Sequence, residues 1–177
     1  MNLRQMFRPR PARLAGETLY EAATRQARQP DFYRALGAPD TTEGRFELYS
    51  LHVVLLLHRL RGGGGEAAET AQALFDTYVS ALDNALREMG VGDLSVAKKM
   101  RKLGEAFYGR AKAYEAALAA RDRAELSALI ERTVFADAAD HDGARLTDYV
   151  FAGVDSLASQ PLETILEGRP LWPPILP

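Results

Sequence analysis

The sequence contains no cysteine. Disulfide bonds, thiolate catalysis, cysteine-ligated iron–sulfur clusters and Cys-type zinc sites are therefore excluded. Long apolar runs are also lacking, because the longest run of Val, Leu and Ile residues is Val53–Leu57, closed by His52 and His58. A helix that spans a bilayer needs about 20 apolar residues. We therefore predict neither a transmembrane helix nor a secretory signal peptide.

Motifs that support catalysis or metal binding are missing as well. The segment "RGGGGE" (residues 61–66) has no Gly-Lys-Ser/Thr ending, so it predicts a flexible linker rather than a phosphate loop. His52 and His58 are six residues apart and would face different directions, and no Glu-x-x-His occurs for a di-iron site. The acidic loop around His141 lacks the spacing of an EF-hand. We expect no enzymatic activity, no metal and no cofactor.

Neither sign of charge is in large excess, since the net charge is −2. This balance gives no support for DNA binding by the molecule as a whole. The N-terminus differs, because residues 1–15 hold four arginines and no acid, and Pro9 and Pro11 interrupt any long helix there. We expect a basic flexible tail over residues 1–15. Contact with anionic lipid and a targeting role are both open for this tail.

The residue pattern of the rest of the chain is typical of α-helices. Its valines and isoleucines form no alternating strand runs, and 177 residues suffice for one domain. We predict an all-α, single-domain helical bundle of about six to eight helices over residues 16–168, with irregular N- and C-terminal tails. Residues 169–177 form the Pro-rich C-terminal tail, on which Trp172 and Ile175 are expected to dock against the body. The predicted helices cover residues 17–28, 31–36, 42–61, 66–89, 94–120, 123–136 and 144–159.

The segment from Thr42 to Arg61 is predicted to be the central helix. At 100° per residue it carries two apolar stripes on opposite sides. The first contains Phe46, Tyr49, Val53, Leu56, Leu57 and Leu60, and the second contains Leu48, Leu51 and Leu55. A helix that is apolar on both sides is normally buried on both sides.

The stretch "LREMGVGDLSVAKKM" (residues 86–100) joins two predicted helices. Gly90 suits the left-handed position that ends the first helix, and Asp93 suits the N-cap of the second. Together they predict a tight antiparallel hairpin. Asp83 and Arg87 are four residues apart on the first helix and are expected to pair.

Four cations crowd the first turns of the second helix of this hairpin. They are Lys98, Lys99, Arg101 and Lys102. Cations near a helix N-terminus oppose the helix dipole by a few tenths of a kcal/mol each. A solvated face and a basic patch for RNA or an acidic partner are both compatible with this cluster.

Arg110 occupies a position where an apolar residue is expected. The inward stripe of its helix runs at alternating spacings of four and three through Val96, Met100, Leu103, Phe107, Arg110, Tyr114 and Ala117. The side chain either extends outward along its aliphatic stem or reaches a buried carboxylate. We expect an acid to hold it, with Asp83 or Glu88 as the partner, and contact with a binding partner is the alternative role.

Two blocks of the sequence resemble the ubiquinol–cytochrome c chaperone family. They are "RQPDFYRALGAPDTTEGRFELYSLH", beginning at Arg28, and "LREMGVGDLSVAKKMRKLGEAFYGRAKAY", beginning at Leu86. The resemblance extends roughly from Tyr20 to Leu118. Members of the family are all-helical assembly factors that are not known as enzymes. The mitochondrial members bind newly made cytochrome b, associate with a small partner protein and contact the ribosome near the tunnel exit.

The resemblance implies a non-enzymatic chaperone that binds newly made cytochrome b and promotes assembly of the cytochrome bc complex. It also implies a cytoplasmic location, with peripheral contact at the inner face of a bacterial membrane (the matrix side in a mitochondrion). Ribosome contact near the tunnel exit is a further implied partner interaction.

A chaperone for an apolar client needs an exposed apolar groove. We expect this groove between the predicted helices 66–89 and 94–120. Its expected aromatic lining is Tyr78, Phe107, Tyr108 and Tyr114. Its expected rim is Arg87, Lys99 and Arg110.

Two other classes of function are compatible with a helical bundle. One is a generic helical adaptor for another membrane or ribosomal partner. The other is a helical enzyme that acts on isoprenoid-like substrates, which would need clustered carboxylates for magnesium. The sequence contains no Asp-Asp-x-x-Asp, so the enzyme has the weaker support.

Overall fold

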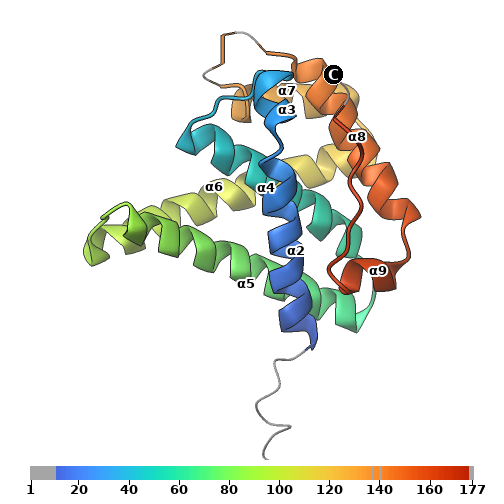
Figure 1. Ribbon diagram of the computed structural model, residues 1–177, viewed down its shortest axis with the longest axis horizontal. Coiled ribbons are helices and arrows are strands. Elements are labelled where there is room, and N and C mark those ends of the chain that lie inside the picture. The colour runs from blue at the N-terminus through green and yellow to red at the C-terminus, as the bar shows by residue number, and fades with distance from the viewer. Residues whose placement is uncertain (1–10, 137, 140, 176–177) are drawn as a thin grey trace, which may run out of the picture.

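The computed structural model describes residues 11–136, 138–139 and 141–175. Every regular element in these residues is an α-helix, which confirms the predicted all-α bundle (Figure 1). The helices are α2 (Pro11–Ala27), α3 (Pro30–Arg34), α4 (Thr42–Leu60), α5 (Gly65–Glu88), α6 (Asp93–Ala120), α7 (Arg123–Thr133), α8 (Gly143–Ser159) and α9 (Leu162–Leu166).

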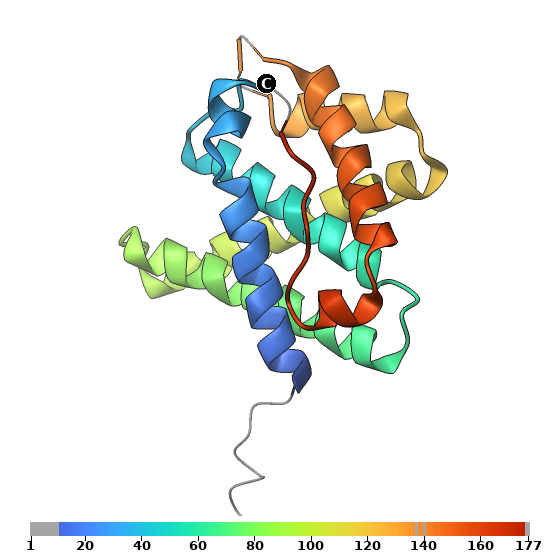
Figure 2. The same ribbon diagram turned by 45° about the vertical axis from the view of Figure 1, so that its right-hand side comes forward.

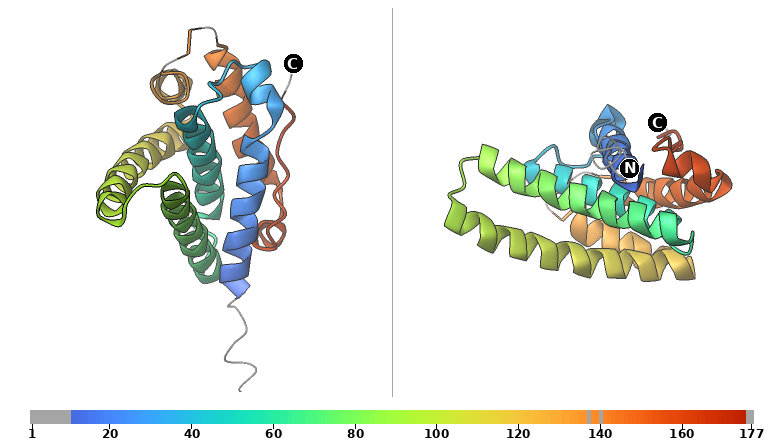
Figure 3. Two further views of the ribbon diagram at one scale, coloured as in Figure 1. Left: turned by 60° about the vertical axis from the view of Figure 1, so that its left-hand side comes forward. Right: turned by 90° about the horizontal axis from the view of Figure 1, so that it is seen from below.

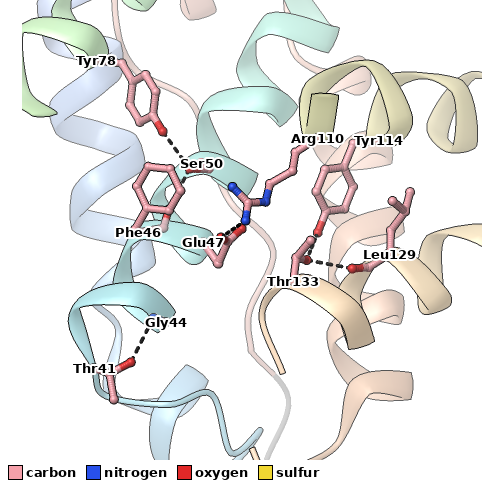
Figure 4. Close-up of polar contacts among 10 residues, drawn as sticks. All are labelled: Thr41, Gly44, Phe46, Glu47, Ser50, Tyr78, Arg110, Tyr114, Leu129 and Thr133. Atoms are coloured by element: carbon pink, nitrogen blue, oxygen red, sulfur yellow. Dashed lines mark hydrogen bonds and ion pairs between the residues drawn. The ribbon is translucent and has the colours of Figure 1, made fainter. Parts of the chain in front are cut away.

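Helix α4 lies at the centre of the molecule, as its two apolar stripes predict. Eleven of its 19 residues are buried, including Leu51 and Leu55 on one side and Val53 and Leu56 on the other. Helices α2, α5, α6 and α8 all pack against it. The helix begins at Thr42 because the Thr41 hydroxyl accepts a hydrogen bond of 3.1 Å from the Gly44 amide (Figure 4).

Helix α2 begins six residues before the predicted start at residue 17. Pro11 opens it, a position that tolerates proline because the first helical amides have no partner within the helix. Ala12 and Ala15 are buried, and Gly16 lies so close to the α5 backbone at Ala73 that a Cβ there would clash. Residues 11–15 are therefore helix rather than tail, and residues 1–10 of the expected tail lie outside the described residues.

Helices α5 and α6 form an antiparallel hairpin that projects from the body (Figures 1 and 3). Gly90 has a φ of 76° and ends α5 as predicted. The Val91 amide bonds to the Leu86 carbonyl at 3.1 Å, and the Gly90 amide to the Arg87 carbonyl at 2.9 Å, which is a Schellman motif.

The expected role of Asp93 as an N-cap is wrong. Gly92 is the N-cap of α6 and contributes no side-chain hydrogen bond, while Asp93 is the first helical residue. Its carboxylate instead accepts from Arg87 at 2.5 Å. Arg87 also donates to Asp83 at 2.6 Å, which confirms the predicted pair within α5. The arginine therefore joins the two helices near the tip of the hairpin.

The C-terminal segment is irregular after α9 and runs between α2 and α8 (Figure 2). Trp172 and Ile175 pack against the core, as predicted, and the Trp172 ring lies 5.1 Å from the His52 ring on α4. The side-chain amide of Gln160 holds the start of the segment. Its Nε2 donates to the Leu171 carbonyl, and its Oε1 accepts from the Leu171 backbone amide.

Candidate functional site: an apolar groove between α5 and α6

An open groove of about 900 Å³ lies between α5 and α6, with α4 as its floor. Figure 3 shows the two helices that flank it. The residues that α5 and α6 contribute are Ala68, Ala71, Gln72, Phe75, Phe107, Tyr108, Ala111, Lys112 and Glu115. Those from α4 and the following loop are Val54, Leu57, Leu60, Arg61, Gly62 and Gly64. Only three of these side chains are charged, so the groove is mainly apolar.

Aromatic rings connect the two walls at the end of the groove nearer the hairpin tip. Phe107 lies 5.6 Å from Phe75 and 4.8 Å from Tyr78, measured between ring centroids. Tyr108 stands edge-on to Phe75 at 5.8 Å and leaves 67% of its surface exposed. Such exposure of a large aromatic residue beside an apolar groove is typical of a binding surface.

Two of the four predicted aromatic residues therefore line the groove, and two do not. Tyr78 and Tyr114 are instead buried in the core. Hydrogen bonds hold both side chains (Figure 4). The Tyr78 hydroxyl lies 2.8 Å from Ser50 Oγ, and the Tyr114 hydroxyl lies 2.7 Å from Thr133 Oγ1. Burial raises the pKa of Tyr114 to about 12. Both tyrosines position the helices rather than face a partner.

The rim of the groove also differs from the prediction. Arg87, Lys99 and Arg110 do not line it, and Arg61, Lys112 and Glu115 do. Glu115 accepts from Arg61 and lies 2.9 Å from His58 Nδ1.

The spacing of residues in the sequence indicates part of this rim. Ala111 and Glu115 lie four residues apart, so they share one side of α6, and Lys112 directly follows Ala111. The contribution of the loop at Arg61 depends on how α4 meets α5 and has no such signal.

Arg110 is held by an acid, but the predicted partners Asp83 and Glu88 are wrong. Its guanidinium lies 2.8 Å from Glu47 Oε1 on α4 and over the Phe46 ring at 5.7 Å (Figure 4). Burial raises the pKa of Glu47, and the positive charge of Arg110 opposes this shift. Whether Arg110 also contacts a binding partner stays a prediction.

The register of the hairpin explains why Asp83 cannot reach Arg110. Tyr78 lies opposite Phe107, and the helices are antiparallel, so Asp83 lies opposite residues near 102. At 1.5 Å per residue this is about 12 Å from Arg110. Periodicity within each helix does not reveal this register, because any shift by one turn leaves both apolar stripes intact.

The predicted basic residues form a second surface, toward the hairpin tip. Lys98, Lys99, Arg101 and Lys102 are all exposed, and Arg101 lies 4.0 Å from Glu105. None of the four lines the groove. The structure therefore places the predicted partner-binding residues in four separate settings. Phe107 and Tyr108 line the groove, Tyr78 and Tyr114 are buried with Arg110 beside them, Asp83 and Arg87 pair near the hairpin tip, and the four cations form the basic surface.

Comparison with known proteins identifies the group to which this architecture belongs. The family model described as "Ubiquinol-cytochrome C chaperone" matches residues 34–172. The chain belongs to this family. The crystal structure of the Cbp3 homolog from Brucella abortus is similar to it, with a TM-score of 0.83 and 35% sequence identity over 93% of this chain and 92% of that one. Comparison with curated proteins gives no match.

The match includes the whole groove, because the family model covers α4 to α9. In the described ranges, no helix is both long and apolar enough to cross a membrane. No group of three or more His, Asp or Glu side chains in the same ranges could hold a metal ion. His141 lies 2.6 Å from Glu131 and stacks on Phe135, while Asp137 and Asp140 of its loop lie outside those ranges.

Proposed function

We propose that this protein is a non-enzymatic assembly chaperone that binds newly made cytochrome b in the groove between α5 and α6. The observation that carries the proposal is the open, mainly apolar groove in a chain of the ubiquinol–cytochrome c chaperone family. Binding there promotes assembly of the cytochrome bc complex by covering apolar surface of the client until its partners arrive.

The shape of the groove suits a helical client. Two helical walls and a helical floor leave room for one further helix, which would bury its apolar face as in helix-in-groove recognition. The walls are lined by Ala68, Ala71 and Ala111, whose small side chains let another backbone approach closely. Phe75 and Tyr108 supply larger contact area at one end.

The proposal is tested by filling the groove. Ala111→Trp places a large ring in open space within the groove, and Ala116→Trp places the same ring on an exposed face of α6 outside it. We expect cytochrome b recovered with the tagged Ala111→Trp protein to fall by about tenfold or more, since a central contact is blocked. Assembled bc complex, measured by b-type haem absorbance of membranes, should fall with it.

The control variant separates binding from folding. Ala116→Trp should recover cytochrome b as the wild-type protein does, and both variants should keep the wild-type helical circular dichroism. Normal recovery of cytochrome b by a folded Ala111→Trp protein would show that the client binds elsewhere.

A further inference from the structure

We infer that the segment held in the groove is an apolar helix of about two turns that places a carboxylate against Lys112. This inference rests on the proposed function and adds the chemistry that the site selects. It follows from the charges of the groove, its length and the size of its wall residues.

The charge of the groove is unbalanced. Its charged lining residues are two cations, Arg61 and Lys112, and one acid, Glu115. The Glu115 carboxylate is already engaged by Arg61 through Oε1 and by His58 through Oε2. Lys112 has no ion-pair partner in the part of the chain that the structure describes. An occupant with a carboxylate would supply one.

The length of the groove sets the length of the occupant. Its lining runs from Phe107 to Glu115 along α6 and from Ala68 to Phe75 along α5. At 1.5 Å per residue these walls are about 12 Å and about 10 Å long, which is two turns of a helix.

The polarity of the walls favours a helical occupant over an extended one. A helix satisfies its own backbone hydrogen bonds, whereas an extended segment would leave amides and carbonyls against apolar walls. No strand edge is present in residues 11–136, 138–139 and 141–175 to pair with it.

The position of Lys112 in the groove favours a helix that carries a carboxylate. It follows Ala111, a small wall residue in the groove, and precedes Glu115 by one turn. The apolar residues of the occupant would face Ala111. An acidic residue at the edge of that apolar face would meet the ammonium group of Lys112. A phosphate headgroup of a lipid has the same sign of charge, but the small alanine side chains of the two helical walls favour close approach of a protein helix.

The test uses two synthetic peptides of 16 residues, rich in Leu and Ala, that differ only by Glu or Lys at the central position. Binding is measured by fluorescence anisotropy at low ionic strength. The wild-type protein should bind the Glu peptide about three- to fivefold more tightly than the Lys peptide, as expected for a partly exposed ion pair. Lys112→Glu should reverse this preference.

Arg25→Glu is the matched control. It makes the same change of net charge at an exposed position of α2 outside the groove, so the preference for the Glu peptide should persist. Equal affinities of the wild-type protein for the two peptides, no binding of either, or an unchanged preference in Lys112→Glu would overturn the inference. Binding of phosphatidylglycerol vesicles that depends on Lys112, without peptide binding, would assign the site to lipid and also overturn it.

The outcome is distinguishable from failure of the proposed function. If Ala111→Trp abolishes recovery of cytochrome b while the peptides show no charge preference, only the inference about Lys112 is wrong. If Ala111→Trp recovers cytochrome b normally, the groove itself is the wrong site.

Discussion

At the scale of single residues, His52 shows how the core accommodates a polar side chain. Its Nδ1 lies 2.7 Å from the Leu48 carbonyl, which can only accept, so Nδ1 carries the proton. Its Nε2 then accepts from the Tyr149 hydroxyl at 2.9 Å, and that hydroxyl accepts from Gln26 at 3.0 Å. Phe32 and Trp172 pack edge-on to the ring. The surroundings therefore favour the neutral form.

We predict that His52 makes the fold sensitive to acid. Burial lowers the pKa of His52 from 6.5 to about 4, so below pH 6.5 the unfolded chain binds a proton that the folded chain does not. The free energy of unfolding should fall by about 2 kcal/mol from this group between pH 7.5 and pH 5. Urea titrations of the wild-type protein and of His52→Gln measure it. The variant should be less stable at neutral pH yet lose this part of the pH dependence, and an equal pH dependence in both proteins would refute the assignment.

Arg110 and Glu47 give a second prediction at this scale. Arg110→Leu leaves the buried Glu47 carboxylate without its cation and should cost about 1–3 kcal/mol at pH 7, less than a fully buried pair because Arg110 is partly exposed. The pKa of Glu47 is already raised by burial and rises further without Arg110. The loss should therefore shrink as the pH falls through the raised folded-state pKa values of Glu47, which lie above its ordinary value of 4.5, because the folded carboxyl is then protonated in both proteins.

The double variant Arg110→Leu/Glu47→Gln distinguishes a structural role from client binding. It should recover most of the lost stability, as measured by urea unfolding. A folded double variant that fails to support bc complex assembly would give Arg110 a role in client binding, whereas full complementation would leave it a structural one.

At the scale of elements, the sequence predicts which faces of a helix are buried and where some helices end, because residue spacing and capping residues determine these features. The two stripes of α4 and the Gly90 turn follow from spacing and from a φ that favours glycine, and both are present. The predicted start of α2 is too late because the prediction treats Pro11 as a helix breaker, although the first turn of a helix tolerates proline. The partner of Arg110 and the Arg61 edge of the groove depend on how neighbouring helices are aligned. The spacing of residues within one helix does not determine that alignment, so neither feature could be predicted from it.

The two glycines of the hairpin turn should differ in their response to substitution. Gly90 has a φ of 76°, so Gly90→Ala forces an L-residue into a left-handed conformation and should cost about 1 kcal/mol. Gly92 has a φ of −64° and open space around it, so Gly92→Ala should change stability by less than about 0.5 kcal/mol. Thermal unfolding of the two variants checks this, and equal losses would contradict the Schellman assignment.

The basic surface of α6 provides a prediction that is independent of the groove. Lys98→Glu/Lys99→Glu reverses two exposed charges, so the fold should be nearly unaffected. If the surface contacts RNA or anionic lipid, cosedimentation with ribosomes or vesicles should weaken, and so should its dependence on salt. Unchanged cosedimentation would leave these lysines as a solvated face.

At the scale of the whole molecule, the α5–α6 hairpin is an arm that carries two chemically different surfaces. The apolar groove lies at its base against α4, and the exposed cations of α6 lie toward its tip. If the groove holds the client as proposed, this separation leaves the basic surface accessible at the same time. The buried residues Glu47, Tyr78 and Tyr114, together with the partly exposed Arg110, fix the position of the arm relative to α4 and α7.

The absence of cysteine makes the central claim directly measurable, because one introduced cysteine is the only thiol. Ala111→Cys in the groove and Ala116→Cys outside it can each carry a benzophenone cross-linker on α6. During synthesis of cytochrome b, illumination should link cytochrome b to position 111 and give little product at position 116. Cross-linking that is equal at the two positions, or stronger at 116, would contradict the account of the groove as the client site.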